Sequence, residues 1–206
     1  MFDLLKTAGA DRIMSVDLHA AQSQGFFDGP VDHLIAMPVL VDYIRDRFSN
    51  QLDNVAVVSP DAGRIRVAEQ WAQRLGGGPL AFVHKTRDIT RPNQAVANRV
   101  VGDVEGKDCV LVDDLIDTAG TIAGACSVLK DAGAKSVTVV ATHGVLSGPA
   151  VERLKNSGAR EVVLTDTVPI PEEKRWDGLT VLSIAPLLAS AIRAVSVSYT
   201  HLTLPT

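Results

Sequence analysis

Short apolar runs alternate with amphipathic segments along almost the whole chain. The runs are rich in Val, Leu, Ile and Ala and have the length of buried strands, whereas the segments between them repeat apolar residues every three or four positions. Strands are predicted at 12–17, 55–59, 80–84, 109–112, 136–141, 161–164 and 180–183. Helices are predicted at 38–48, 64–75, 121–131, 148–156 and 186–195. This alternation predicts an α/β fold with a mostly parallel sheet and helices on both faces.

A short pattern near the N-terminus recurs later in the chain. Leu-Lys-Thr-Ala-Gly-Ala at 5–10 is nearly repeated as Leu-Lys-Asp-Ala-Gly-Ala at 129–134, and each copy reaches a histidine, His19 or His143, at the same spacing. A helix, a glycine and a strand recur in α/β proteins generally, but the repeat equally indicates two related domains. The opening favours the second interpretation, because the chain begins in a helical pattern that feeds a strand with no earlier strand to pair with. We therefore expect one complete domain plus the remnant of a second, similar domain.

Composition and charge narrow the class of protein. A chain of 206 residues with 46% hydrophobic and 4% aromatic residues can bury the core of one α/β domain or a little more. The net charge of −4 gives no electrostatic reason to expect binding to nucleic acid or to a membrane surface. Cys109 and Cys126 lack metal or redox spacing and are predicted to be buried thiols. Without a basic, apolar leader or a run of about 20 apolar residues, the chain is predicted to be soluble and cytoplasmic.

Residues 110–121, Val-Leu-Val-Asp-Asp-Leu-Ile-Asp-Thr-Ala-Gly-Thr, form the most informative motif. An apolar run ends in two adjacent carboxylates, Asp113 and Asp114, and a loop of small residues then leads into a helical pattern. The backbone N–H groups of such a loop and of a helix N-terminus suit a phosphate. The carboxylates would repel a phosphate and suit neutral hydroxyls, such as those of a ribose, or a metal. The alternative is an ordinary strand–helix turn with exposed acids.

Polar residues also follow other predicted strands, where the sites of open α/β sheets usually lie. Asp17 and His19 are two positions apart, and His19 is interpreted either as a ligand for Mg²⁺ or phosphate or as a structural histidine. Asp61 lies in the turn Ser-Pro-Asp-Ala-Gly-Arg at 59–64, whose small residues allow close approach to a pyrophosphate. It could hold a magnesium ion through water or cap a helix, and the two roles are compatible.

Two further segments follow strands. The segment 84–93 contains Lys85, Arg87 and Arg91 and lacks an apolar period, so it is predicted to be a mobile loop whose cations clamp a polyphosphate, with a solvated surface loop as the alternative. His143, in the segment 141–149, either closes the site or is structural. Residues 196–206 show no helix or strand period and are predicted to be disordered or foreign to the fold.

Taken together and in this order, the motifs resemble those of the phosphate-activated ribose-phosphate pyrophosphokinase (PRPP synthetase) family. The resemblance rests on Val-Asp-Leu-His-Ala at 16–20, Gln-Gly-Phe-Phe-Asp at 24–28, Ser-Pro-Asp-Ala-Gly at 59–63, Lys-x-Arg at 85–87 and the acidic loop at 112–121. The loop at 110–121 also resembles the ribose-phosphate loop of type I phosphoribosyltransferases, whose fold the resemblance implies. Lys-Thr-Arg-Asp at 85–88 and Arg64 are similar to actinobacterial members.

The resemblance implies that the diphosphoryl group of ATP is transferred to the C1 hydroxyl of ribose 5-phosphate, giving PRPP and AMP for nucleotide biosynthesis. Magnesium would be bound by His19 and Asp61, and Lys85 and Arg87 would be the catalytic cations. Ribose 5-phosphate would be held by Arg87, Asp113, Asp114, Asp117, Thr118, Ala119, Gly120 and Thr121. Gln24 and Asp32 would lie near a regulatory site for phosphate and ADP, and members of the family form homo-oligomers.

The resemblance also implies a domain division and a departure from the family. Residues 1–37 match the end of an N-terminal domain that is mostly missing, 38–185 match the whole C-terminal domain, 186–195 match a helix returning to the first domain, and 196–206 leave the pattern. We therefore expect a truncated chain with weak or no activity. One alternative is a phosphoribosyltransferase that consumes PRPP, which is not expected to share the Asp-Leu-His segment or Lys85-x-Arg87. Another is a non-catalytic PRPP-synthetase-associated regulatory protein, against which the presence of Lys85 and Arg87 argues.

Overall fold

The computed structural model describes residues 1–86 and 97–196, with no side-chain description for residues 85, 86, 97 and 98. The chain divides into two compact units. Among the described residues, the first contains Met1–Ala36 and 183–196, and the second is Met37–Leu182. The predicted domain boundaries, and the identity of the first unit as part of a second related domain, stay predictions.

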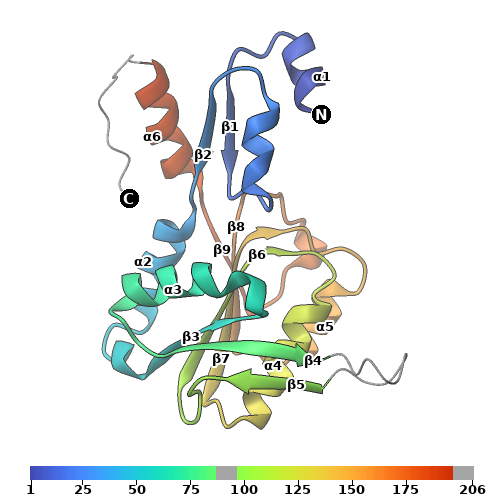
Figure 1. The fold of residues 1–206 in the computed structure, drawn as a ribbon. Helices are drawn as coiled ribbons and strands as arrows, with labels where there is room; N and C mark the ends of the chain where they lie inside the picture. Colours follow the sequence, from blue (N-terminus) through green and yellow to red (C-terminus); the bar gives the residue numbers. More distant parts are fainter. Residues whose placement is uncertain (87–96, 197–206) are drawn as a thin grey trace. The chain divides into compact units, whose positions relative to one another are not determined.

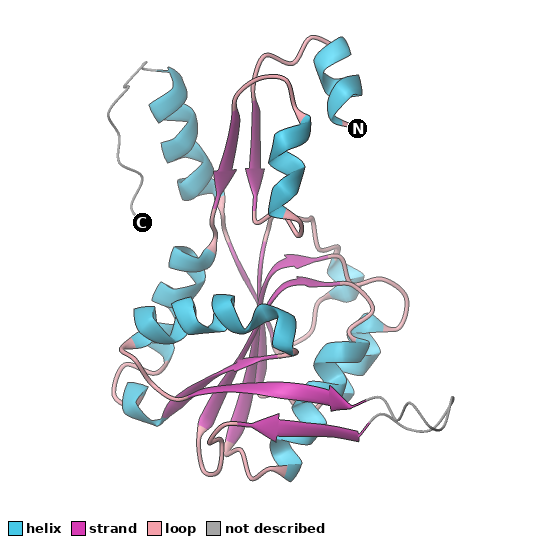
Figure 2. Ribbon diagram, in the orientation of Figure 1, coloured by secondary structure: helices cyan, strands magenta, loops and turns pink. Residues whose placement is uncertain are grey.

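The second unit is built on a seven-stranded sheet with the order β5-β4-β3-β6-β7-β8-β9 (Figures 1 and 2). Its strands are β3 (Val55–Ser59), β4 (Leu80–Thr86), β5 (Ala97–Val101), β6 (Asp108–Ile116), β7 (Ser136–Gly144), β8 (Glu161–Thr165) and β9 (Leu179–Leu182). Neighbouring strands run parallel except β4 and β5, which are antiparallel. The predicted α/β class with a mostly parallel sheet is confirmed.

The direction of the chain across the sheet reverses between β3 and β6. From β3 the chain crosses through α3 (Ile65–Leu75) to β4 on one side, and from β6 it crosses through α4 (Gly120–Asp131) to β7 on the other. Because such crossovers are right-handed, α3 and α4 cover opposite faces, together with α2 (Met37–Arg47) and α5 (Ala150–Asn156) respectively (Figure 1). The carboxyl ends of β3 and β6 therefore meet at a topological switch point, the usual ligand position in this architecture.

The central strands form the core because both of their faces are covered. Each residue of β3 is buried, as are the first five residues of β6. The predicted apolar face of the helix after β6 is confirmed: Ile122, Ala125, Cys126 and Leu129 are all buried. Cys109 and Cys126 are buried free thiols, as predicted.

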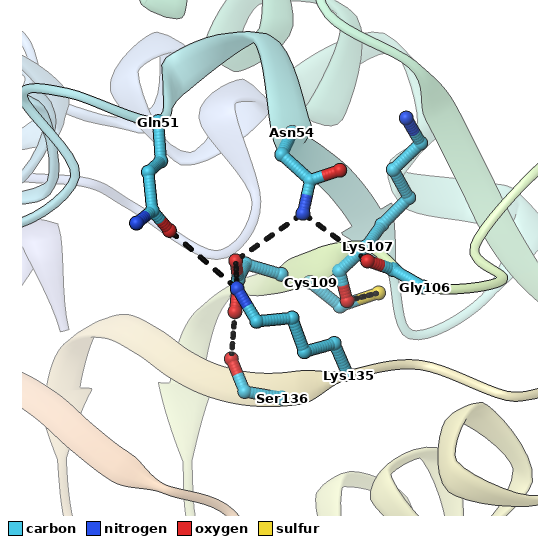
Figure 3. A network of polar contacts seen from close by, with 8 residues as sticks. Gln51, Asn54, Gly106, Lys107, Cys109, Lys135 and Ser136 are labelled. Carbon is cyan, nitrogen blue, oxygen red and sulfur yellow. Dashed lines mark hydrogen bonds and ion pairs between the residues drawn. The ribbon is translucent and has the colours of Figure 1, made fainter.

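A buried carboxylate joins the central strands at the start of β6, the end of the sheet opposite the switch point. Figure 3 shows the residues around it, including Asn54, Lys135 and Ser136. Asp108, at the start of β6, is 1% exposed and accepts hydrogen bonds from Ser136 Oγ at 2.7 Å and Lys135 Nζ at 2.8 Å. Asn54, just before β3, donates to the same carboxylate at 3.4 Å. Burial alone would raise the pKa of Asp108, but the hydrogen bonds from Lys135 and Ser136 outweigh it and lower the pKa.

Several strand predictions need correction. The predicted strands ending at 112 and 141 continue as β6 and β7 to Ile116 and Gly144, because the polar residues at their ends keep pairing, for example Leu115 with His143. β4 continues to Thr86, so 84–86 form a strand rather than the start of a mobile loop. The rest of that predicted loop, from 87 to 93, lies outside the described residues. The antiparallel strand β5 was not predicted.

The first unit contains α1 (Phe2–Thr7), β1 (Ile13–Val16), a 3₁₀ helix (Ala21–Phe26), β2 (Val31–Leu34) and α6 (Ala185–Ser196). β1 pairs in parallel with β2, which follows it in the chain. The strand β2 was not predicted, because its mixed sequence Val-Asp-His-Leu gives no apolar run. The predicted tail lies almost entirely outside the described residues.

None of the helices within the described ranges is long and apolar enough to cross a membrane.

Candidate functional site

The loop after β3 is held in shape by its own side chains. Ser59 is fully buried, and its Oγ donates to the Asp61 carbonyl at 2.6 Å. The Gly63 N–H donates to Asp61 Oδ1 at 2.8 Å, so Asp61 caps the short 3₁₀ helix Ala62–Arg64. The capping interpretation of Asp61 is confirmed. Its role as a magnesium ligand, compatible with the cap, stays a prediction.

Arg64 connects this loop to the acidic pair at the end of β6. Its Nη2 contacts Asp114 Oδ2, and its Nε lies 3.9 Å from Asp113 Oδ1. Asp113 Oδ1 also accepts the Asp114 N–H at 2.9 Å. The three side chains are only 24%, 16% and 11% exposed, in the order Arg64, Asp113 and Asp114. The structure thus joins two separately predicted segments through a residue to which the sequence analysis gave no role in the site.

Asp113 is an unusual acid in this setting. Burial and the adjacent Asp114 raise its pKa to about 7, although the charge of Arg64 opposes the increase. Asp113 therefore keeps its proton to a higher pH than an ordinary carboxyl does. A carboxyl pair in this state can both accept hydrogen bonds from hydroxyls and donate one, which suits a neutral polyol. The alternative of an ordinary turn with exposed acids is wrong in one respect, because the side chains of Asp113 and Asp114 are mostly buried.

The loop 117–121 contains a left-handed residue directly before the first turn of α4. Ala119 adopts the left-handed region, with φ 59° and ψ 12°, immediately before α4 begins at Gly120. Successive N–H groups around such a residue form a concavity that suits an anion, and the positive end of the helix dipole adds to it. Ala119 is buried, while Asp117, Thr118, Gly120 and Thr121 are exposed to solvent. The predicted phosphate loop is therefore accessible from solvent.

His143, at the end of β7, is held by polar residues that the sequence analysis missed. Its Nδ1 lies 2.9 Å from Thr167 Oγ1, and Thr167 in turn donates to the Thr142 carbonyl at 3.1 Å. Thr165, fully buried at the end of β8, also donates to the Thr142 carbonyl at 2.7 Å. These bonds support the structural interpretation of His143, because they fix the ring within the unit. In the sequence, only the pair Thr165 and Thr167 after the apolar run 161–164 could have indicated this arrangement.

The cations predicted to act in transfer are only partly described. Lys85 lies in β4, where its backbone pairs with Asn98 of β5, and its side chain is not described. Arg87 lies outside the described residues. Because β4 is parallel to β3, its end opens at the same edge of the sheet as the loop 59–64.

The remaining predicted residues belong to the first unit. Gln24 Nε2 donates to the Ala21 carbonyl at 3.1 Å and lies 3.1 Å from His33 Nδ1, while Asp32 pairs with Arg12 at 2.6 Å. His19 belongs to this unit and Asp61 to the other, and their shared role as magnesium ligands stays a prediction. Across the described part of the chain, no group of three or more His, Cys, Asp or Glu side chains is arranged to hold a metal ion. Mg²⁺ often takes only one or two protein carboxylates, together with water and substrate phosphates.

Comparison with known proteins gives consistent matches. The family described as "Phosphoribosyl synthetase-associated domain" matches residues 82–201. Ribose-phosphate pyrophosphokinase from Bifidobacterium longum is 95% identical over 195 residues, which cover 95% of this chain and 57% of that protein. The Mycobacterium tuberculosis protein of the same name is 65% identical over 193 residues, which cover 94% of this chain and 59% of that protein. The chain thus spans less than two thirds of the length of these relatives.

A solved structure matches as well. The crystal structure of phosphoribosylpyrophosphate synthetase from Mycobacterium smegmatis superposes with a TM-score of 0.87 and is 62% identical in sequence. The match covers 95% of this chain and 62% of that one.

Proposed function

Because the chain belongs to the ribose-phosphate pyrophosphokinase family, we propose that its second unit binds ribose 5-phosphate as the acceptor of a diphosphoryl group from ATP. The phosphate would lie against the N–H groups of 117–121, and the ribose hydroxyls would lie against Asp113 and Asp114. One observation carries this proposal: a hydroxyl-accepting carboxyl pair and an anion-binding loop occupy one short segment at the switch point of the sheet. Ribose 5-phosphate carries hydroxyls at one end and a phosphate at the other, so each end would face the part of the segment that suits it.

The charges of the segment support this orientation. Ionised carboxylates repel a phosphate, so the acidic pair takes the sugar end and the exposed loop takes the phosphate end. In this structure, the Arg64 guanidinium contacts the pair that the hydroxyls would use. Ribose hydroxyls would share or replace that contact, and the partly protonated Asp113 can hydrogen-bond them in either direction.

Transfer itself requires positioning and charge stabilisation rather than a covalent nucleophile. The C1 hydroxyl must lie in line with the β-phosphorus of ATP, and cations must follow the charge that develops on the transferring group. Lys85 and Arg87 are proposed for that role, and the end of β4 opens at the edge where the loop 59–64 lies. Magnesium would neutralise the polyphosphate when bound. Asp61 fits it as a carboxylate whose Oδ1 is fixed by Gly63, and His19 is the second proposed ligand.

The overall activity is proposed for the full-length protein, because the chain spans only 57–59% of the curated relatives named above. In that protein the products would be PRPP and AMP. A polypeptide of these 206 residues alone is expected to bind ribose 5-phosphate and to make little PRPP. Regulation by phosphate or ADP near Gln24 and Asp32, and homo-oligomer formation, remain predictions. The names of the relatives favour this function over a phosphoribosyltransferase that consumes PRPP.

The proposal is tested by titrating the ¹⁵N-labelled chain with ribose 5-phosphate and following amide shifts. The amides of 117–121 are expected to shift first, and inorganic phosphate should shift the same amides with weaker affinity. Asp113→Ala should weaken binding of ribose 5-phosphate while leaving the affinity for inorganic phosphate nearly unchanged, because the acid pair contacts only hydroxyls. Absence of shifts in 117–121 at millimolar ribose 5-phosphate would refute the proposal.

A further inference from the structure

Arg153, on α5, is a cation that contacts the loop 117–121 through the backbone of Thr118. Its Nη1 donates a hydrogen bond to the Thr118 carbonyl at 2.9 Å. The same atom lies 3.5 Å from the point that a Cβ on Gly120 would occupy. Neither the sequence motifs nor the proposed contacts with ribose 5-phosphate include this residue.

The hydrogen bond from Arg153 fixes the direction of a peptide group in the loop. In a planar trans peptide, the C=O and the following N–H point in opposite directions. With the Thr118 carbonyl turned toward Arg153, the Ala119 N–H is turned away from it. The backbone N–H of Ser147 acts in the same way on the preceding peptide by donating to the Asp117 carbonyl at 3.0 Å, which sets the direction of the Thr118 N–H.

The loop needs such external bonds because its conformation is costly. Ala119 has φ 59°, a region that costs a residue with a Cβ about 1–2 kcal/mol. Strained residues persist only where their surroundings hold them, and here the bonds to Asp117 and Thr118 come from Ser147 and α5. A guanidinium also adds positive charge close to the place proposed for the phosphate.

We propose that Arg153 is a positioning residue that holds the loop 117–121 in its anion-binding conformation and strengthens phosphate binding from behind. This inference rests on the proposed binding of ribose 5-phosphate at the same loop. Arg153 acts through the Thr118 carbonyl and the field of its charge, and it need not touch the ligand.

The test compares Arg153→Met, Arg153→Lys and the matched control Lys155→Met, an exposed cation on the same helix. Dissociation constants for ribose 5-phosphate are measured from the amide shifts of 117–121 in the full 206-residue chain. Arg153→Met should weaken binding about 5- to 20-fold, the effect of losing one charged hydrogen bond in a partly exposed position. Arg153→Lys should weaken it less, and the control should leave it unchanged.

Several outcomes separate positioning from a general structural role. Thermal unfolding midpoints close to wild type, together with weaker binding by Arg153→Met and an unchanged affinity of the control Lys155→Met, support the proposal. Equal affinities of Arg153→Met and wild type overturn it. If Arg153→Met does not fold, Arg153→Lys decides, and an unchanged affinity in that variant also overturns the proposal.

The failure of the proposed function itself has a different signature. If ribose 5-phosphate shifts no amides of 117–121 in the wild-type chain, the binding proposal fails. The positioning claim is then tested on the ligand-free proteins, where Arg153→Met should still change the amide shifts of Ala119 and Gly120. Unchanged shifts at both residues would overturn it.

Discussion

Replacing Arg64 by Gln removes the positive charge that contacts the acidic pair, while it keeps much of the length of the side chain. The Nε of Arg64 lies 3.9 Å from Asp113 Oδ1, a separation at which two unit charges interact by about 1 kcal/mol in water and about 4 kcal/mol at an effective dielectric constant near 20. These energies correspond to about 0.8 and 3 pKa units. Because Arg64 is 24% exposed and Asp113 is 16% exposed, an intermediate rise of about 1–2 units in the pKa of Asp113 is expected.

The assay is a pH titration of the Asp113 and Asp114 carboxyl carbons by ¹³C NMR in the wild type and in Arg64→Gln. His143, on the neighbouring strand beside Leu115, is followed in the same samples to report any change in the surrounding structure. Arg175→Gln, which removes an arginine paired with Glu172 elsewhere in the unit, serves as the control. If the apparent pKa values of the pair change by less than about 0.3 units, Arg64 does not set the charge of the pair and the electrostatic reasoning is wrong.

Three further predictions test the site and the fold. Burial raises the pKa of Asp113 to about 7, so ionising this carboxyl lowers the free energy of unfolding more and more as the pH rises from about 4 to about 7. In urea unfolding, Asp113→Asn should therefore be as stable as wild type near pH 4 and more stable than wild type near pH 8. Parallel pH profiles of the two proteins would contradict this. Because the pKa of Asp108 is lowered, the ionised carboxylate stabilises the fold above about pH 4, and this stabilisation is lost on acidification. Asp108→Asn should therefore lower the free energy of unfolding by about 2 kcal/mol at pH 7 and by less at pH 3. An equal loss at both pH values would show that the charge of Asp108 is not involved. Ala119→Val places a β-branched residue at φ 59° and should lower the free energy of unfolding by about 2 kcal/mol or more, measured by chemical denaturation. Ala123→Val, in the following helix, is the control. Equal effects of the two changes would show that the left-handed conformation is not the cause.

The parts of this protein that could be predicted from sequence are those determined by residues close together in the chain. The apolar runs of β3 and β6 predicted buried strands. These strands are buried because helices cover both of their faces. The acidic pair and the loop 117–121 could be assigned as one candidate site because a single segment carries both. The capping role of Asp61 was also local, since it depends on the N–H of Gly63 two residues away.

Only the tertiary structure determined the contacts between segments. Arg64 and Asp114 are 50 positions apart, and Arg153 is 35 positions from Thr118, so no periodicity could connect them. The pairing of β2 with β1 and the extension of β6 and β7 past their apolar runs escaped prediction, because backbone hydrogen bonds to a neighbouring strand do not require apolar side chains. The sequence by itself thus determined which strands form the centre of the sheet and which of them are followed by the polar candidate residues. The charge state of Asp113 and the orientation of the loop depended on residues that only folding brings together.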